Sequence, residues 1–445
     1  MDTPICDFVR EYHKNDPLRL HMPGHKGIPV LGMEQLDITE IDGADSLYEA
    51  SGIIAQSEKN AGMLFGCPTF YSTEGSSQCI RAMLYLAHLY ARLKGKKPII
   101  AAGRNVHKTF LTAVAMLDMD VCWLYPKNHV SYLSCELSAD ELDSYLKQMI
   151  DKPTAVYLTN PDYLGNMSDI RAMAEVCHRH DVLLIVDNAH GAYLKFLPES
   201  MHPIDLGADL CCDSAHKTLP VLTGGAYLHL SSSLDDIICK QAKNALAMFG
   251  STSPSYLILQ SLDAANPYLE NYPQVLEDYI PIVDSLKNKL LEHGFRLYGS
   301  EPMKLTIYAK SYGYTGTQIA ELLQRHNIMP EFSDQDYLVL MLSPEIGADG
   351  IQQLEQALLE IPPKPAIVQT PPIFSPGERA LTIRKAMLSA SEILPSEQCL
   401  GRIVAVPAVG CPPAVPILIC GEKIDSHALS CFSYYEIKEC CVVKE

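Results

Sequence analysis

The sequence is short of basic residues. Its 445 residues include 35 Lys and Arg against 53 Asp and Glu, which gives a formal net charge of -18 and an isoelectric point near 5.3. Recognition of nucleic acid requires clustered Lys and Arg facing phosphates, so this balance argues against a nucleic-acid partner. The acidity favours cationic small molecules instead, as a weak bias that salt screens.

Segments that direct a protein into or across a membrane are also missing. Residues 1–17 are charged throughout and contain no apolar core of a signal peptide. Residues 403–420 carry no charge, but four prolines interrupt them, and prolines would break a helix in lipid. We therefore expect a buried extended segment there, no membrane partner, and a soluble, cytoplasmic protein.

Cysteine patterns that bind metal or form disulfide frameworks are absent. The 15 Cys occur singly or as the adjacent pairs Cys211-Cys212 and Cys440-Cys441, and no CxxC is present. Disulfide frameworks belong to short secreted chains, and structural zinc sites to paired CxxC repeats. The sequence predicts buried free thiols and no bound metal.

What is present is the alternating pattern of an α/β protein. Helical spacing of apolar residues in 77–93 and 168–180 alternates with short apolar runs at 98–102, 155–158 and 182–186. This alternation predicts a parallel sheet with helices on both faces. Ligands of such sheets bind beyond the carboxyl ends of the strands, so we expect the chemistry in the loops that follow these runs.

The pattern changes near residue 271. A helix at 275–291, a strand at 304–308, a helix at 318–325 and a strand at 337–342 predict a smaller α+β domain. Six prolines between Pro362 and Pro376 predict a stiff connection. The expected domains are residues 1–270 (an N-terminal segment and a large domain), 271–361 (the small domain) and 362–445 (the connection and a C-terminal module).

Three elements of the large domain fit the needs of pyridoxal 5′-phosphate (PLP), in chain order. Ser76 and Ser77 precede a predicted helix, where hydroxyls and backbone N–H groups can hold a phosphate, although serines there also serve as ordinary N-caps. Asp187 ends the strand VLLIV, where a carboxylate can keep the pyridine nitrogen protonated; it could equally cap the next segment or bind a metal. Lys217 lies in a run whose only other charge is Asp213, and a lysine in a dry site can form a Schiff base, or can simply pair with an acid.

Four blocks together resemble the Orn/Lys/Arg decarboxylases. They are residues 20–27 (LHMPGHKG), 104–108 (RNVHK), 186–191 (VDNAHG) and 214–218 (SAHKT). The resemblance spans nearly the whole chain, and an ordered set of blocks is far more specific than any single one. It implies the aspartate-aminotransferase fold (PLP fold type I), PLP as cofactor, and decarboxylation of arginine, lysine or ornithine to the corresponding amine and CO₂.

The resemblance also implies roles for individual residues. Lys217 would form the internal aldimine that the substrate amine displaces, and Asp187 would pair with the ring nitrogen. His107 would stack on one ring face and Ala189 would pack on the other. The phosphate would be held by the following side chains: Ser76, Ser77, Ser214 and His216. His190 would contribute to the cofactor site, or only brace Asp187.

Residues that bind the substrate are less well defined by the sequence. Glu74 stands where many relatives carry Asn, and because phosphate would repel a carboxylate we expect it to face the substrate or a basic partner. Further candidates are His21 and His25, Arg384 and Arg402 for the substrate carboxylate, and Asp334, Asp336 or Glu345 for its distal cation. Each could instead serve only the fold. Residues 411–416 resemble a terminal block of the family but depart from it, so that module's contribution stays open.

The first family block begins at residue 20, so we expect no N-terminal wing domain, and the resemblance then favours a homodimer or a dimer of dimers with shared active sites. Two other functions compete: another fold-type-I PLP activity such as transamination, and a catalytically silent regulatory homologue. An intact set of Lys217, Asp187 and His107 weighs against a silent protein.

Overall fold

The structure is a computed structural model that describes residues 1–127, 131–373, 375–409 and 415–445. The chain forms two compact units. The first unit comprises Met1–Pro98, Thr154–Tyr157 and Ile170–Glu277, and the second comprises Ile99–Pro153, Leu158–Asp169 and Asp278–Glu445. The three-domain division expected above stays a prediction.

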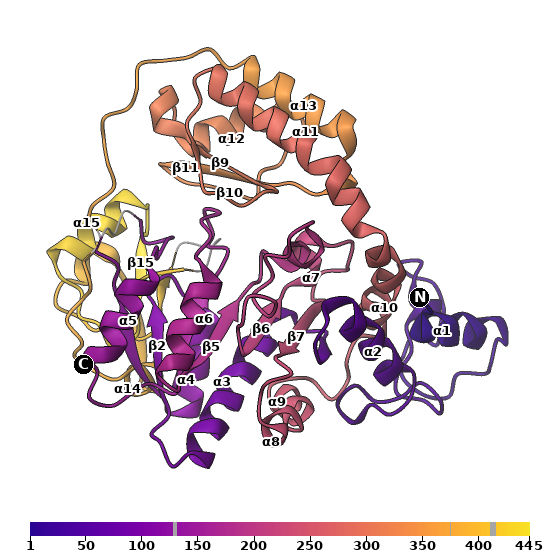
Figure 1. Ribbon diagram of the computed structural model, residues 1–445. Coiled ribbons are helices and arrows are strands. Elements are labelled where there is room, and N and C mark those ends of the chain that lie inside the picture. The colour runs from indigo at the N-terminus through magenta and orange to yellow at the C-terminus, as the bar shows by residue number, and fades with distance from the viewer. Residues whose placement is uncertain (128–130, 374, 410–414) are drawn as a thin grey trace. The chain divides into compact units, whose positions relative to one another are not determined.

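The first unit contains most of the helices that flank the large sheet (Figure 1). Its helices are α1 (Pro4–Lys14), α2 (Ile53–Phe65), α3 (Gly75–Leu93), α6 (Ile170–Arg179), α7 (Ala215–Thr218), α8 (Asp236–Cys239), α9 (Ala242–Ala247), α10 (Tyr256–Glu270) and the start of α11 (Tyr272–Glu292). Its strands are β1 (Thr69–Ser72), the first part of β4 (Ala155–Thr159), β5 (Leu183–Asp187), β6 (Leu210–Asp213) and β7 (Ala226–Leu230).

The large sheet has the strand order β1-β7-β6-β5-β4-β2-β3. β5 is buried along its whole length, as expected of a strand covered on both faces. The strands predicted at 98–102, 155–158 and 182–186 are confirmed, with small shifts at their ends. The expected α/β architecture, a large sheet with helices, is likewise confirmed.

One feature of the sheet differs from the prediction, because the sheet is mixed and not wholly parallel. β5 pairs with β6 in parallel, but β7 runs antiparallel to both β6 and β1. A parallel return requires a long crossover, usually through a helix. The connection from β6 to β7 holds α7, a helix of four residues, which is too short for that crossover.

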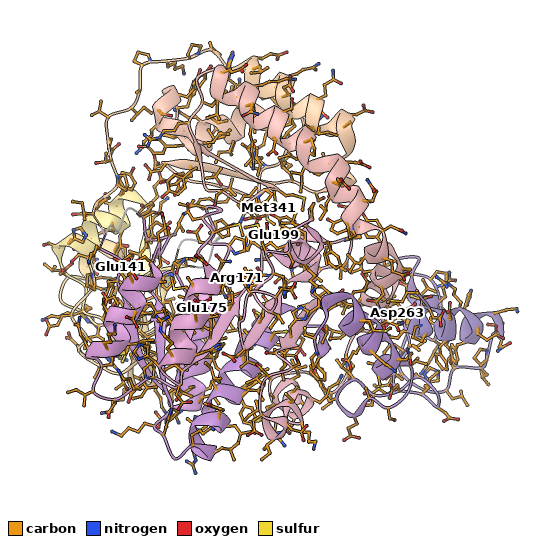
Figure 2. All side chains as sticks on the ribbon, in the orientation of Figure 1. Glu141, Arg171, Glu175, Glu199, Asp263 and Met341 are labelled. Carbon is orange, nitrogen blue, oxygen red and sulfur yellow. The ribbon has the colours of Figure 1, made fainter. Side chains whose placement is uncertain are left out.

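The N-terminal helix α1 is attached to α10 by a buried carboxylate. Asp263 of α10 accepts hydrogen bonds from the backbone N–H groups of Ile5 (3.0 Å) and Cys6 (2.9 Å) at the first turn of α1 (Figure 2). These N–H groups have no partner within their own helix. The contact therefore fixes where α1 begins against the rest of the first unit.

The second unit contains the parallel pair β2 (Ile99–Gly103) and β3 (Asp120–Leu124) with α4 (Lys108–Leu117) and α5 (Ala139–Gln148). It also contains a four-stranded sheet of order β10-β11-β9-β8, with α12 and α13 on one side of it (Figure 1). The bounds are β8 (Leu297–Tyr298), β9 (Lys304–Tyr308), α12 (Gly316–Gln324), β10 (Phe332–Ser333), β11 (Tyr337–Met341) and α13 (Gly347–Leu359). The predicted small α+β arrangement is confirmed.

The C-terminal residues build two short antiparallel pairs and two helices. They are α14 (Ile383–Met387), β12 (Ser391–Pro395) paired with β15 (Glu439–Val443), β13 (Ala408–Val409) paired with β14 (Pro416–Leu418), and α15 (Ser426–Tyr434). Buried side chains at 415–420 agree with the expected buried extended segment. Residues 411–414 of the divergent terminal block lie outside the described residues.

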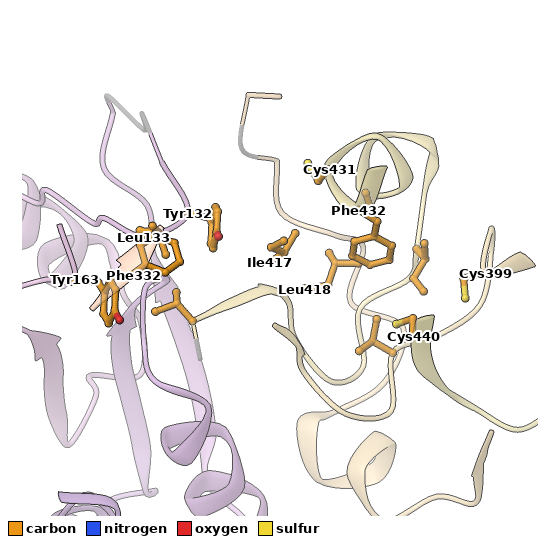
Figure 3. Packing of buried hydrophobic residues seen from close by; sticks show 14 of the residues in the cluster. Tyr132, Leu133, Tyr163, Phe332, Cys399, Ile417, Leu418, Cys431, Phe432 and Cys440 are labelled. Atoms are coloured by element: carbon orange, nitrogen blue, oxygen red, sulfur yellow. The ribbon is translucent and has the colours of Figure 1, made fainter. Parts of the chain in front are cut away.

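An apolar cluster joins these C-terminal elements to the small sheet within the second unit (Figure 3). Tyr163 and Phe332 pack edge to face with ring centroids 5.4 Å apart, and Ile417, Leu418 and Phe432 belong to the same buried cluster. Edge-to-face aromatic pairs and buried apolar area both stabilise such packing.

A buried ion pair adds to this packing. Arg104, in the loop after β2, donates to Glu422 at 2.9 Å, and both side chains are almost wholly buried. Of the cysteines that the structure describes, all are free thiols and most are buried.

Candidate active site

Lys217 lies on α7, just beyond the carboxyl end of β6. Its Nζ is 3.0 Å from Nε2 of His190, which belongs to the loop after the neighbouring strand β5. A protonated Lys217 donates this hydrogen bond, and His190 Nε2 then accepts it. The lysine is thus held by a side chain from the adjacent loop, at the edge of the sheet where ligands of α/β proteins bind.

Asp187 is the last residue of β5 and is 2% exposed. Its Oδ2 accepts a hydrogen bond from the Tyr157 hydroxyl at 3.0 Å, and its Oδ1 accepts from the Ala189 N–H at 3.2 Å and from the Cys212 thiol at 3.7 Å. Burial raises the pKa of Asp187, and the positive charge of Lys217 opposes this shift. A cationic partner for this buried carboxylate would relieve the cost of its desolvation.

Two hydroxyls meet at the amino end of α3. Ser214 Oγ donates to Ser76 Oγ at 2.7 Å, joining the residue before α7 to the second residue of the 19-residue helix α3. Gly75 begins that helix with φ +70°, a conformation that favours glycine, and its N–H donates to Gly224 O at 2.7 Å. Ser77 follows in the same first turn, where backbone N–H groups and the helix dipole favour an anion.

His216 and Glu74 border these hydroxyls. His216 Nδ1 is 3.0 Å from Gly225 O, and burial lowers the pKa of the His216 imidazole. The Glu74 carboxylate accepts from the backbone N–H of Ser251. The expectation that Glu74 faces the substrate or a basic partner stays a prediction.

This set of groups fits PLP. An amine (Lys217), a buried carboxylate (Asp187) and paired hydroxyls at a helix N-terminus (Ser76 and Ser214) are the groups that an aldehyde, a pyridine nitrogen and a phosphate require. The structure brings them together within the first unit from the loops after β5 and β6 and the start of α3. Ala189 lies on the same loop as Asp187.

His107 belongs to the second unit, where it is the N-cap of α4. Its Nδ1 accepts from the Thr109 N–H at 3.2 Å and lies 2.9 Å from the Thr109 hydroxyl. The capping contact explains why a histidine starts this helix. Stacking of its ring on a cofactor stays a prediction.

The candidate substrate residues have partners within their own units. His25 lies 3.2 Å from Asp37 and accepts from the Gly27 N–H, so it shapes the turn in block 20–27. Asp334 accepts from two backbone N–H groups at 2.7 Å, those of residues 336 and 337, and burial raises its pKa to about 6. These contacts serve the fold, and a substrate role stays a prediction for both residues.

The remaining candidates are similarly engaged. Arg384 donates to the carbonyls of residues 115 and 116 at the end of α4. Arg402 pairs with Glu392 at 2.7 Å. Asp336 pairs with Lys310 at 2.9 Å, and all of these contacts lie within the second unit. A substrate role stays a prediction for these three residues.

Sequence reasoning missed the side chains that support Asp187 and Lys217. Tyr157 was expected only as part of a strand, and Cys212 and Asn188 had no expected role. The signal that could have identified Tyr157 is the single hydroxyl in the otherwise apolar run 155–158, since a buried hydroxyl needs a hydrogen-bond partner.

Comparison with known proteins points to the same class of enzyme. A family model described as Orn/Lys/Arg decarboxylase, major domain, matches residues 3–298. The chain belongs to this family. The arginine decarboxylase of Bacillus subtilis is 28% identical over 96% of this chain and 92% of its own length, and that of Bacillus anthracis is 27% identical over 96% and 92%.

Solved structures show the same fold. The lysine decarboxylase of Francisella novicida has a TM-score of 0.81 at 16% identity, covering 99% of this chain and 81% of its own. The constitutive lysine decarboxylase of E. coli has a TM-score of 0.77 at 17% identity, covering 100% and 82%. At such identities the likeness concerns the fold.

This decarboxylase is therefore a PLP-dependent enzyme that acts on a basic amino acid. PLP supplies the electron sink for such a reaction when bound. Among the helices that the structure describes, none is both long and apolar enough to cross a bilayer.

Proposed function

We propose that the enzyme decarboxylates arginine to agmatine and CO₂. The observation that carries the choice of arginine is the agreement of several relatives: proteins named arginine decarboxylase from three Bacillus species and Halalkalibacterium halodurans match 96–97% of this chain at 26–28% identity. The lysine decarboxylases share the fold at only 16–18% identity.

The site residues receive the following roles in this proposal. The Lys217 amine holds the cofactor aldehyde, and His190, 3.0 Å away, holds or accepts a proton of that amine. Asp187 keeps the pyridine nitrogen protonated, and Tyr157 holds the carboxylate in place. Phosphate is bound by the following side chains: Ser76, Ser77, Ser214 and His216.

Product analysis tests this proposal. Purified protein loaded with PLP is given arginine, lysine or ornithine in separate reactions, and CO₂ and amines are measured. The expected result is CO₂ and agmatine in equal amounts from arginine, with slower release from the other two. Faster release from lysine or ornithine would reject arginine as the substrate, and a keto acid without CO₂ would indicate transamination. A Lys217→Ala variant gives the background.

We also propose that the enzyme is a homodimer or a dimer of dimers. Seven large apolar side chains are exposed in residues 18–33. Four of them are at least 80% exposed, namely Leu18, Leu20, Val30 and Leu31. Exposed apolar surface concentrated in one segment is typical of an interface. Val30→Asp should shift the mass measured by light scattering toward the monomer. Ile150→Asp, at an isolated side chain that is 99% exposed, is the control that should leave the mass unchanged.

A further inference from the structure

A charged cluster lies wholly buried at the carboxyl end of β6. Asp213 is the last residue of this strand, and its Oδ2 is 3.1 Å from Nε2 of His202 and 3.1 Å from Nε2 of His229. All three side chains are 0% exposed. A carboxylate in this position needs compensating charge, because an isolated buried ion is very costly.

The hydrogen bonds indicate which group supplies that charge. Thr69 Oγ1 donates to Cys67 O at 3.1 Å, and in that arrangement His229 Nδ1, 2.9 Å away, donates to the hydroxyl. His229 Nε2 donates to Asp213, which leaves both ring nitrogens protonated. His202 instead accepts from the backbone N–H of Ile204 through Nδ1, at 3.4 Å.

The same carboxylate reaches the loop that carries Asp187. Asn188 Nδ2 donates to Asp213 Oδ1 at 2.6 Å, and the Asn188 N–H donates to Cys212 O at 3.0 Å. Asn188 stands between Asp187 and Ala189, while Asp213 directly precedes Ser214. One side chain therefore connects the two loops on which the amine, the acid and a phosphate-binding hydroxyl lie.

Gly191 shows how tightly this connection is packed. A Cβ at Gly191 would lie 2.1 Å from Asn188 Oδ1, so no larger residue fits there without moving the amide. The loop after β5 is thus built around the position of Asn188.

We propose that Asp213 is a positioning residue of the cofactor site: as half of a buried ion pair with a doubly protonated His229, it fixes the Asp187 loop to the Ser214–Lys217 turn. The identity of the bound group rests on the proposed function. The groups that face His229 are Asp213 and Cys211 of β6, His202, Cys67, Thr69 and Tyr227. The acid in this set lifts the pKa of His229 against the effect of burial.

A metal ion is the competing occupant. Ligand atoms of His202, Cys211 and Asp213 lie within 4.8 Å of one another. A bound cation would require its ligands to be deprotonated, the Cys211 thiol among them. The proposed ion pair needs no cation, so the metal content of the purified protein separates the two readings.

The first test is the protonation state of His229 in the full-length wild-type protein. Nitrogen-15 spectra of protein labelled in its histidine rings are recorded at pH 8, with His229→Gln to assign the signal. Two protonated nitrogens on His229 are expected, together with a metal content near zero. An unprotonated nitrogen on this ring, or a stoichiometric divalent cation, would overturn the proposal.

The second test compares two isosteric variants on the same segment. Asp213→Asn should weaken PLP binding about tenfold or more, because hydrogen bonds to a charged group are lost. Asp209→Asn is the matched control: Asp209 accepts from His178 at 3.0 Å but precedes the amino end of β6, away from the loops. Its PLP affinity should stay within about twofold of wild type. Equal affinities for the two variants would reject the positioning role.

A third variant covers the case in which Asp213→Asn fails to fold. Asn188→Ala keeps the carboxylate and both histidines, and should still weaken PLP binding about fivefold through loss of one charged hydrogen bond; unchanged affinity would contradict the proposal. Failure of the proposed function is a separate result, because the ring protonation and the PLP affinity do not depend on which amino acid is decarboxylated.

Discussion

The hydroxyl of Tyr157 gives the sharpest mutational prediction. Tyr157→Phe removes the 3.0 Å hydrogen bond to Asp187 Oδ2 and leaves the Ala189 N–H and Cys212 thiol on the other oxygen. Both Tyr157 and Asp187 are buried in the same strand layer, at 0% and 2% exposure. The substitution deletes one oxygen atom and keeps the packing of the ring.

The magnitude follows from the charge of the acceptor. A hydrogen bond to an ionised group contributes about 1.5–3 kcal/mol, and one pKa unit corresponds to about 1.4 kcal/mol. Burial already raises the pKa of Asp187, and Lys217 and the Tyr157 hydrogen bond oppose that shift. Loss of the bond should raise this pKa further. Because the carboxylate must be ionised to hold the ring nitrogen protonated, the acidic limb of kcat/KM should move to higher pH.

The assay is CO₂ release from arginine as a function of pH, together with PLP affinity and thermal unfolding. Tyr256→Phe is the matched control, because its hydroxyl is equally buried and donates to Asp45 O at 2.6 Å, away from Asp187. It should lower stability by about 1 kcal/mol, as expected for a neutral hydrogen bond, and leave the pH profile unchanged. A Tyr157→Phe profile that overlays the wild-type curve would show that this hydroxyl does not hold the carboxylate.

Three further predictions concern other parts of the chain. Ser214→Ala removes the hydroxyl that donates to Ser76 at 2.7 Å. It should weaken PLP binding about tenfold, as measured by equilibrium titration. An unchanged affinity would show that Ser214 and Ser76 do not bind the phosphate. Glu422→Gln removes the carboxylate that balances the buried charge of Arg104, and should lower the free energy of unfolding by about 3 kcal/mol in urea titrations. A loss below about 1 kcal/mol would contradict the buried pair. Backbone hydrogen bonds lower the pKa of Glu34 to about 2. The stability that these contacts contribute should therefore be present above about pH 4.5 and be lost as the pH falls toward 2. A titration midpoint of Glu34 near 4.5 in nuclear magnetic resonance spectra would refute this prediction.

Much of the fold could be predicted because burial and periodicity are local. The run VLLIV predicts β5, and the helical spacing after residue 76 predicts α3, since apolar side chains must face the core in either element. The direction of β7 could not be predicted, because it depends on a short connection and on pairing with β1, which is distant in sequence. Strand direction is a property of the sheet as a whole.

Some residues of the candidate site could likewise be predicted from local patterns, whereas the residues that support them could not. Lys217, Asp187 and Ser76 could be chosen because each follows a recognisable strand or precedes a helix, and the structure brings them to one edge of the sheet. The side chains that support these residues could not be predicted, because contacts such as that of Asn188 with Asp213 join residues that are 25 positions apart in the sequence. A buried hydrogen-bond network depends on three-dimensional placement, which no local pattern encodes.

Lys217 as the residue that holds the cofactor is tested most directly by borohydride reduction of the PLP-loaded enzyme, followed by proteolysis and mass spectrometry of the peptides. One modified lysine is expected, at position 217, and no modification in Lys217→Ala. Modification of a different lysine, or of none while PLP remains bound, would contradict this role of Lys217.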